Sequence, residues 1–211
     1  MKNKKLILFF IIFLPSMMWL VLELSTINTR RLPFYGPKSF NGIDSVFYSI
    51  ESKFKNANRE NVSIDTLQNP LYVVCFIKQS YKSDNYRLAG LSEYAQYKAE
   101  KIKEIPFYII SPCDSVSCFD EFKKISVTNA NVQNLHWNTN SFDSLNLSYF
   151  KEKPYYVDYS YLVLVDNNRH IRGYYDARYV SEIKRLIEEY QHLRLKEEKK
   201  NLLNQNKIEV H

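Results

Sequence analysis

The sequence predicts an α/β domain in which helices cover both faces of a mixed β-sheet. Two runs of apolar, β-forming residues, 71–77 and 107–110, have the composition of strands that are buried on both faces. A third run, 161–165, is followed by a turn and by the shorter run 171–174. Helical patterns separate these strands, and such an alternation is typical of an α/β fold.

The amino-terminal part of the predicted domain is a hairpin. Residues 47–50 and 62–64 are short strand candidates, and the polar stretch 56–61 lies between them. The buried strand 71–77 comes next. A helix is predicted over 84–103, with Asp84 as its N-cap. Its apolar side chains fall on one side, as an amphipathic helix requires; they are Leu88, Leu91, Ala95 and Ile102.

Strands and helices then alternate toward the carboxyl end. After the strand 107–110, the pattern predicts a helix near 118–125, a weaker strand at 132–137 and a short helix at 141–150.

The final predicted elements are a hairpin and a helix. Turn-forming residues Asp166 to Arg169 join the strands 161–165 and 171–174. The last helix begins near Ala177, and beyond residue 194 a charged tail is expected to fray into solvent. The order of elements is that of a thioredoxin-like sheet with an extra amino-terminal hairpin.

Composition excludes several classes of site. The four glycines are too far apart to form a Gly-x-Gly-x-x-Gly turn or a phosphate-binding loop. The net charge of +6 comes from lysines and arginines that are scattered among acidic residues, whereas nucleic acid calls for a basic stripe with stacking aromatic residues. We therefore expect no nucleotide and no nucleic acid as a partner.

The amino end is predicted to be a membrane anchor. Residues 6–22 carry no charge, and Lys2, Lys4 and Lys5 precede them. By the positive-inside rule this single transmembrane helix leaves the amino terminus in the cytoplasm and the body in the periplasm or outside the cell. A cleaved signal peptide is the alternative, but no small-residue cleavage pattern follows the apolar run.

The predicted organisation has four parts. Residues 1–24 form the anchor, 25–45 a tether, 46–195 the thioredoxin-like domain and 196–211 the charged tail.

Several segments of the chain resemble the Sco/SenC family in order and spacing. They are the tether motif Leu32-Pro33-Phe34-Tyr35-Gly36, the run 71–84 and the hairpin with its exit, 161–176. Members of that family are membrane-tethered thioredoxin-fold proteins that deliver copper to cytochrome c oxidase. The resemblance implies an extracytoplasmic role among respiratory oxidase assembly proteins.

The resemblance also implies that the copper ligands are missing. Where the family has Cys-x-x-x-Cys, this chain has Ser80 and Asp84, and where it has a histidine this chain has Asp158, with Tyr156 as the alternative position. Copper(I) prefers thiolate and imidazole over hydroxyl and carboxylate oxygen. We therefore expect no copper, no other cofactor, and a non-catalytic binding or assembly role at a degenerate site.

The three cysteines leave a second hypothesis open. Cys75 lies inside the apolar strand and is expected to be a buried, small hydrophobic residue. Cys113 and Cys118 follow the strand 107–110, at the edge where parallel strands end. They are either a structural disulfide, two free thiols, or a redox or metal-binding pair. In the redox case the protein is a thiol–disulfide oxidoreductase.

Overall fold

The structure is a computed structural model that describes residues 13–21, 32–40, 45–56, 58–64, 71–78, 85–115, 118, 120, 122, 125–151 and 161–208. The chain divides into two compact units, Met1–Leu32 and Pro33–His211. Of the predicted anchor, only residues 13–21 are described, and they are helical. Within the described ranges, no helix has both the length and the apolar character that crossing a membrane requires.

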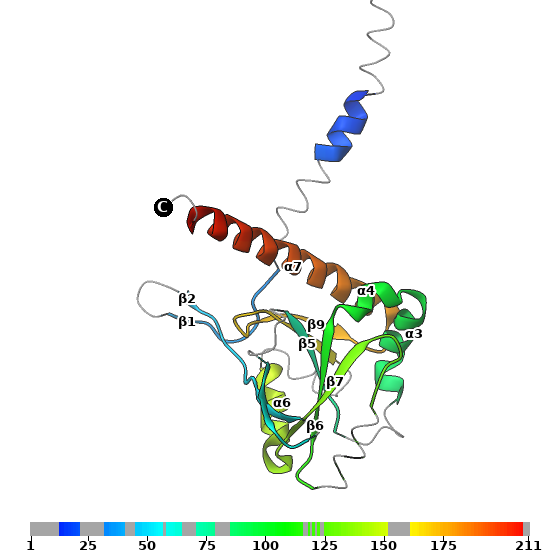
Figure 1. Ribbon diagram of the computed structural model, residues 1–211, viewed down its shortest axis with the longest axis vertical. Coiled ribbons are helices and arrows are strands. Elements are labelled where there is room, and N and C mark those ends of the chain that lie inside the picture. The colour runs from blue at the N-terminus through cyan, green and yellow to red at the C-terminus, as the bar shows by residue number, and fades with distance from the viewer. Residues whose placement is uncertain are drawn as a thin grey trace, which may run out of the picture. The chain divides into compact units, whose positions relative to one another are not determined.

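A seven-stranded sheet forms the centre of the second unit, as far as its residues are described (Figure 1). The strand order is β4-β3-β7-β6-β5-β8-β9. In chain order the strands are β3 Lys53–Asn56, β4 Asn61–Ser63, β5 Tyr72–Phe76, β6 Pro106–Pro112, β7 Asn131–Trp137, β8 Tyr161–Val165 and β9 Ile171–Asp176. Strands β5, β6 and β7 are parallel, while β8 is antiparallel to both β5 and β9. This is the predicted mixed, thioredoxin-like α/β sheet.

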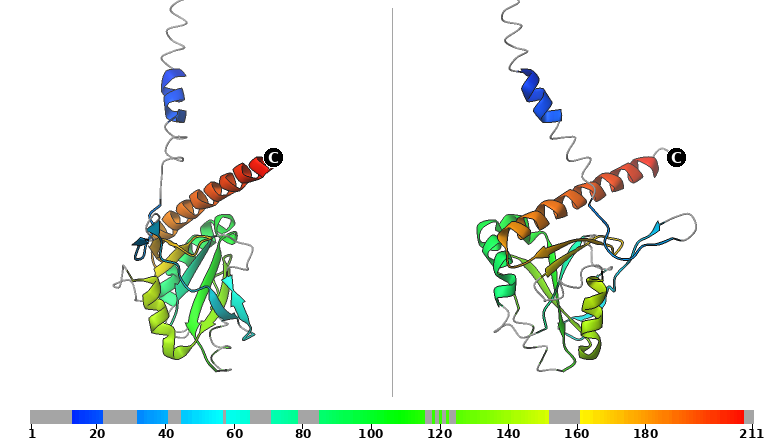
Figure 2. Two further views of the ribbon diagram at one scale, coloured as in Figure 1. Left: turned by 90° about the vertical axis from the view of Figure 1, so that its left-hand side faces the viewer. Right: turned by 180° about the vertical axis from the view of Figure 1, so that it is seen from behind.

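Helices lie on both faces of this sheet. The helical elements are η2 Asn85–Leu88, α3 Ala89–Tyr97, α4 Ala99–Lys103, η3 Thr139–Ser141, α6 Phe142–Tyr149 and α7 Val180–Ile208. Helix α6 packs on one face, while α3 contacts α7, and α7 contacts β9, on the other (Figure 2). All five residues of β5 are buried, because both faces of this central strand are covered.

The core on the α6 side is rich in aromatic rings. Phe76 of β5 lies edge-on to Tyr149 of α6, with ring centroids 4.9 Å apart. The Tyr149 hydroxyl donates to the carbonyl oxygen of Glu51 at 2.8 Å. The Tyr174 hydroxyl of β9 donates to the carbonyl oxygen of Tyr149 at 2.7 Å. Burial of large rings whose polar ends find a partner fixes α6 against the sheet.

The first strand of the amino-terminal hairpin is not where the sequence predicts it. The hairpin pairs β3 with β4, so its first strand begins at Lys53, whereas the prediction placed it at 47–50. Residues 47–50 instead lie against the tip of the β8–β9 hairpin. There, the Ile50 N–H donates to the carbonyl oxygen of Arg169 at 3.1 Å. A separate short pair, β1 Ser39–Phe40 with β2 Ser45–Val46, spans the predicted boundary at residue 45 between tether and domain.

Two predicted helices also need correction. The predicted helix 84–103 is broken at Lys98 into α3 and α4, and begins with the 3₁₀ turn η2. Helix α7 runs to Ile208, beyond the predicted end near residue 194 and through most of the segment assigned to a charged tail. Side-chain pairs one turn apart support this stretch; for example, Arg194 Nε donates to Glu198 Oε1 at 3.1 Å.

Candidate functional site at the carboxyl edge of the sheet

The parallel strands β5, β6 and β7 end at one edge of the sheet. Because they are in register, Ile110 of β6 lies between Phe76 of β5 and Leu135 of β7. The residue after β6, Cys113, donates its N–H to the carbonyl oxygen of Trp137 at 2.9 Å. Such an edge is the usual ligand site of open α/β sheets.

Cys113 and Cys118 are joined in a disulfide at this edge, and their Cα atoms are 5.6 Å apart. Cys113 is 2% exposed, whereas Cys118 is half-buried. Residues 118, 120 and 122 are helical, so Cys118 lies where the helix predicted over 118–125 begins. Cys118 is therefore the more exposed residue of the pair.

Asp114 ties the loop after β6 to the end of β7. Its carboxylate accepts the backbone N–H of Thr139 at 2.8 Å. Hydrogen bonds from Thr139 lower the pKa of Asp114, and the nearby Lys55 ammonium adds a smaller effect in the same direction. The carboxylate is thus ionised at neutral pH.

Ser111 and His136 form a buried polar pair on neighbouring strands. Both are 0% exposed, and Ser111 Oγ lies 3.1 Å from His136 Nδ1 and 3.4 Å from the carbonyl oxygen of Leu135. Burial lowers the pKa of His136 to about 4. At neutral pH this imidazole is uncharged, and with both side chains fully buried we assign the pair a supporting role in the sheet.

We expect His136 to make stability fall in mild acid. The unfolded chain takes up a proton here below about pH 6.5, and the folded protein takes it up only below about pH 4. From about pH 7 to about pH 5, this difference lowers the free energy of unfolding by about 2 kcal/mol. Urea unfolding at both pH values measures it. The variant His136→Gln should lose most of this fall, and an equal fall in the variant would contradict the assignment.

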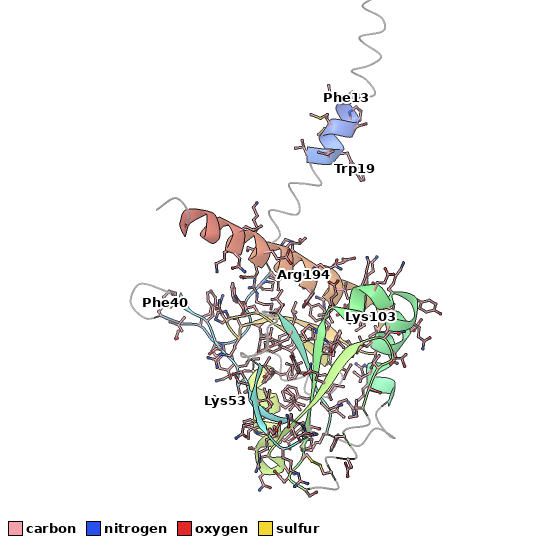
Figure 3. The ribbon with its side chains drawn as sticks, in the orientation of Figure 1. Phe13, Trp19, Phe40, Lys53, Lys103 and Arg194 are labelled. Atoms are coloured by element: carbon pink, nitrogen blue, oxygen red, sulfur yellow. A yellow bond between two sulfur atoms is a disulfide. The ribbon has the colours of Figure 1, made fainter. Side chains whose placement is uncertain are left out.

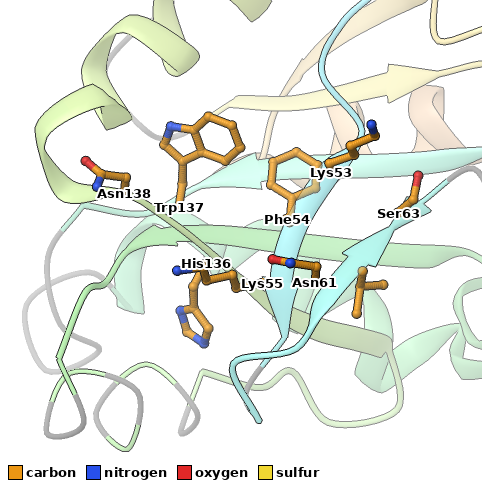
Figure 4. A pocket seen from close by; sticks show the side chains of 9 residues that line it. Lys53, Phe54, Lys55, Asn61, Ser63, His136, Trp137 and Asn138 are labelled. Atoms are coloured by element: carbon orange, nitrogen blue, oxygen red, sulfur yellow. The ribbon is translucent and has the colours of Figure 1, made fainter.

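A hollow of about 530 Å³ lies beside this edge, where strands β3 and β4 meet the end of β7 (Figure 4). Its lining residues are Lys53, Phe54, Lys55, Asn61, Val62, Ser63, His136, Trp137 and Asn138. Sequence reasoning missed this site. The hollow depends on the antiparallel pairing of Lys55 with His136, and no local pattern of apolar residues encodes which strands pair.

The remaining predicted site residues divide into two groups. Ser80, Asp84, Asp158 and Tyr156 lie outside the described residues, so the predicted degenerate copper positions stay predictions. Cys75 lies in β5, is 2% exposed and takes part in no disulfide. All three cysteines of the chain are thus placed, one within the sheet and two bonded to each other.

No family model and no curated protein matches this chain. The similar proteins that the comparison finds are solved structures. A SCO1/SenC family lipoprotein from Bacillus anthracis str. Ames is 14% identical, over 68% of this chain and 95% of that protein, with a TM-score of 0.49. BsSco, a member of the Sco family of cytochrome c oxidase assembly proteins, is 18% identical, over 66% of this chain and 92% of its own, with a TM-score of 0.48.

A thiol:disulfide interchange protein from Bacteroides sp. is also similar. It is 13% identical, over 67% of this chain and 88% of that protein, with a TM-score of 0.46. The thioredoxin-like assignment of this chain rests on its own strand order and directions.

Proposed function

We propose that this protein is a membrane-anchored, extracytoplasmic binding or assembly factor, related to the copper-insertion proteins of cytochrome c oxidase, that does not itself carry copper. The placement of its three cysteines is the observation that supports this most. Cys75 is buried within β5, and Cys113 and Cys118 are bonded to each other. Copper(I) prefers thiolate ligands, and in this arrangement no pair of thiols is offered to it.

Copper(I) titration of the full chain in detergent tests this proposal. With the disulfide left oxidised, we expect no tight one-to-one complex. The matched control is the double variant Cys113→Ser/Cys118→Ser, which removes the two sulfurs that accidental reduction would release. Tight one-to-one binding by both the native chain and this control would reject the proposal.

A second candidate function is thiol–disulfide exchange, and the bonded pair at the carboxyl edge favours it. In the reduced form, the thiolate of the more accessible Cys118 attacks a substrate disulfide and releases one substrate thiolate. The Cys113 thiolate then attacks the Cys118 sulfur, re-forming the protein disulfide and releasing the second thiolate. The substrate is reduced, the pair is oxidised, and a dithiol reductant must reduce the pair again.

Activity of the full chain in an insulin-reduction assay with dithiothreitol separates the two functions. A binding factor should not increase the rate above that of dithiothreitol alone. An increase that Cys118→Ser abolishes and Cys75→Ala leaves intact would establish exchange by the pair, since Cys75 lies within the sheet.

A deletion strain complemented with Cys113→Ser/Cys118→Ser gives the second measurement. Restored oxidase activity there is expected for a binding factor, whereas failure would favour exchange.

A further inference from the structure

The β1–β2 hairpin carries the most exposed large hydrophobic side chain among the described residues. Phe40 is 82% exposed, and Val46 on the facing strand is 46% exposed. The two strands form a sheet of their own, which shares no strand with the seven-stranded sheet. Figure 3 shows Phe40 well outside the body of the domain. Because a lone two-stranded hairpin is marginally stable in water, this one gains stability from any further surface on which it packs.

The base of this hairpin is held on the domain. Phe34, which precedes β1, stacks on Phe47, which follows β2, with ring centroids 4.1 Å apart. Lys38 Nζ lies 5.7 Å from the centroid of the Phe47 ring. The Tyr35 N–H donates to the carbonyl oxygen of Ile171 at 3.0 Å. Both ends of the hairpin are thus ordered before anything binds, which lowers the entropic cost of docking.

The two apolar side chains point to opposite faces of the ribbon. Ser39 is paired with Val46, so their side chains share one face, and Phe40, the next residue, points to the other face. A flat protein surface would cover one of these apolar side chains and leave the other in water. The headgroup region of a bilayer surrounds an inserted ribbon and covers both, and aromatic side chains are enriched at that depth. The arrangement therefore favours lipid over protein as the occupant.

The chain keeps this hairpin within reach of a bilayer if the predicted anchor spans one. The described residues of that anchor, 13–21, form a helix without charge whose large hydrophobic side chains are 49–71% exposed. The domain is attached from Pro33 onward, because the Pro33 carbonyl oxygen accepts Arg172 Nε at 3.1 Å. Residues 22–32 join the two and span at most about 40 Å when fully extended, little more than the diameter of a small domain.

The hairpin suits the headgroup region and not the hydrocarbon core. The outer backbone groups of a two-stranded ribbon have no strand partner, and such groups are not tolerated against lipid tails. Among the described residues 38–40 and 45–46, the one charged side chain is that of Lys38, which is exposed. A lysine at the membrane surface is attracted to anionic headgroups.

We propose that the β1–β2 hairpin docks on the lipid headgroup region, with Phe40 and Val46 inserted there and Lys38 beside anionic headgroups. This inference rests on the membrane anchoring in the proposed function. It adds a second contact with the bilayer, which holds the domain in one orientation on the membrane surface.

Depth-dependent quenching of a fluorescent label tests this inference. The full chain is reconstituted into vesicles of phosphatidylcholine and phosphatidylglycerol, with the dye NBD attached to Phe40→Cys. The native cysteines do not compete for the dye, because Cys75 is buried and the other two are bonded. A lipid quencher near the headgroups should remove at least about half of the fluorescence, and a quencher deep in the acyl chains should remove less. Val46→Cys, on the opposite face, should behave in the same way.

The matched control is Lys103→Cys carrying the same dye. Lys103 is exposed on α4, and Figure 3 shows it far from Phe40 across the domain. Lipid quenching should be absent there. Equal quenching at positions 40 and 103, or quenching at only one of positions 40 and 46, would overturn the inference. So would protection of the label at position 40 from aqueous iodide without lipid quenching, because this result would identify a protein as the occupant.

Flotation of the same vesicles separates failure of this inference from failure of the proposed function. A chain that floats with the vesicles but shows no lipid quenching at position 40 is anchored, so only the docking of the hairpin is rejected. A chain that stays behind rejects the anchoring itself, and the docking of the hairpin with it.

Discussion

Replacing Asp166 with alanine is expected to lower the free energy of unfolding by about 3–5 kcal/mol, the usual cost of removing one partner from a buried ion pair. Asp166 Oδ2 pairs with Arg172 Nη1 at 3.0 Å, and both residues are less than a tenth exposed, at 4% and 8%. The alanine variant leaves the Arg172 guanidinium buried without this carboxylate. It also removes the acceptor of two backbone N–H groups at the hairpin tip, those of Asn168 and His170.

The reason for so large an effect is that this ion pair joins distant segments of the chain. Arg172 Nε donates to the carbonyl oxygen of Pro33 at 3.1 Å, and its guanidinium lies 3.9 Å from the ring centroid of Phe34. Phe34 in turn stacks on Phe47, with centroids 4.1 Å apart. Loss of Asp166 therefore weakens the contact between the hairpin and the segment that precedes the sheet.

Three variants make the Asp166 prediction specific. Asp166→Asn keeps an oxygen at the turn but loses the charge, so it should cost less, about 1–3 kcal/mol. Asn167→Ala, at the exposed tip of the same turn, should change stability by no more than about 0.5 kcal/mol. The double variant Asp166→Leu/Arg172→Met should recover part of the loss, because no buried charge remains. Urea unfolding followed by tryptophan fluorescence measures all of them, and equal losses in Asp166→Ala and Asn167→Ala would contradict the prediction.

The second large effect is expected at Gly90, in helix α3. A Cβ atom added there would lie 2.7 Å from the backbone N and C atoms of Tyr179 and 2.8 Å from the backbone C of Arg178. The neighbouring Leu91 N–H donates to the carbonyl oxygen of Ala177 at 3.2 Å, so α3 and the turn before α7 are held close together. Backbone atoms cannot move aside as a side chain would.

We therefore expect Gly90→Ala to destabilise the fold by about 1–3 kcal/mol, as overpacking of a closely packed contact does. Intrinsic helix propensity acts in the opposite direction, because alanine is favoured over glycine by about 1 kcal/mol within a helix. The sign of the change therefore decides between the two effects. The measurement is the urea concentration at the midpoint of unfolding. A change of this midpoint reports stability when the slope of the unfolding free energy against urea concentration stays the same.

The matched control for Gly90 is Ala89→Gly, at the neighbouring exposed position of α3. It should cost no more than about 1 kcal/mol, through helix propensity alone, because Ala89 is the first residue of α3. A neutral or stabilising Gly90→Ala, alongside the expected loss in the control, would show that α3 does not approach Tyr179 as closely as described.

Strands β5, β6 and β8 could be predicted from the sequence because each is a short apolar run between polar or turn-forming residues, and β9 because turn-forming residues separate it from β8. Continuous apolar character indicates burial on both faces, and such burial requires helices above and below. The mixed α/β class follows, and so does the expectation that Cys113 and Cys118 lie at the carboxyl edge. The prediction at 47–50 was wrong because that segment pairs with the hairpin tip, far along the chain, through the contacts of Ser49 with His170.

By itself, the sequence determined the class of the fold, the identity of its central strands and the edge at which its cysteines lie, because these depend on patterns within single segments. Only the tertiary structure decided that β3 pairs with β7, that the two sulfurs are bonded, and that Lys53, Lys55 and Trp137 surround one hollow. Each of these brings together residues that are distant in the chain or lie in an irregular loop. The free energies of such long-range contacts depend on side-chain packing and on which segments pair. The local periodicity of the sequence carries no information about either.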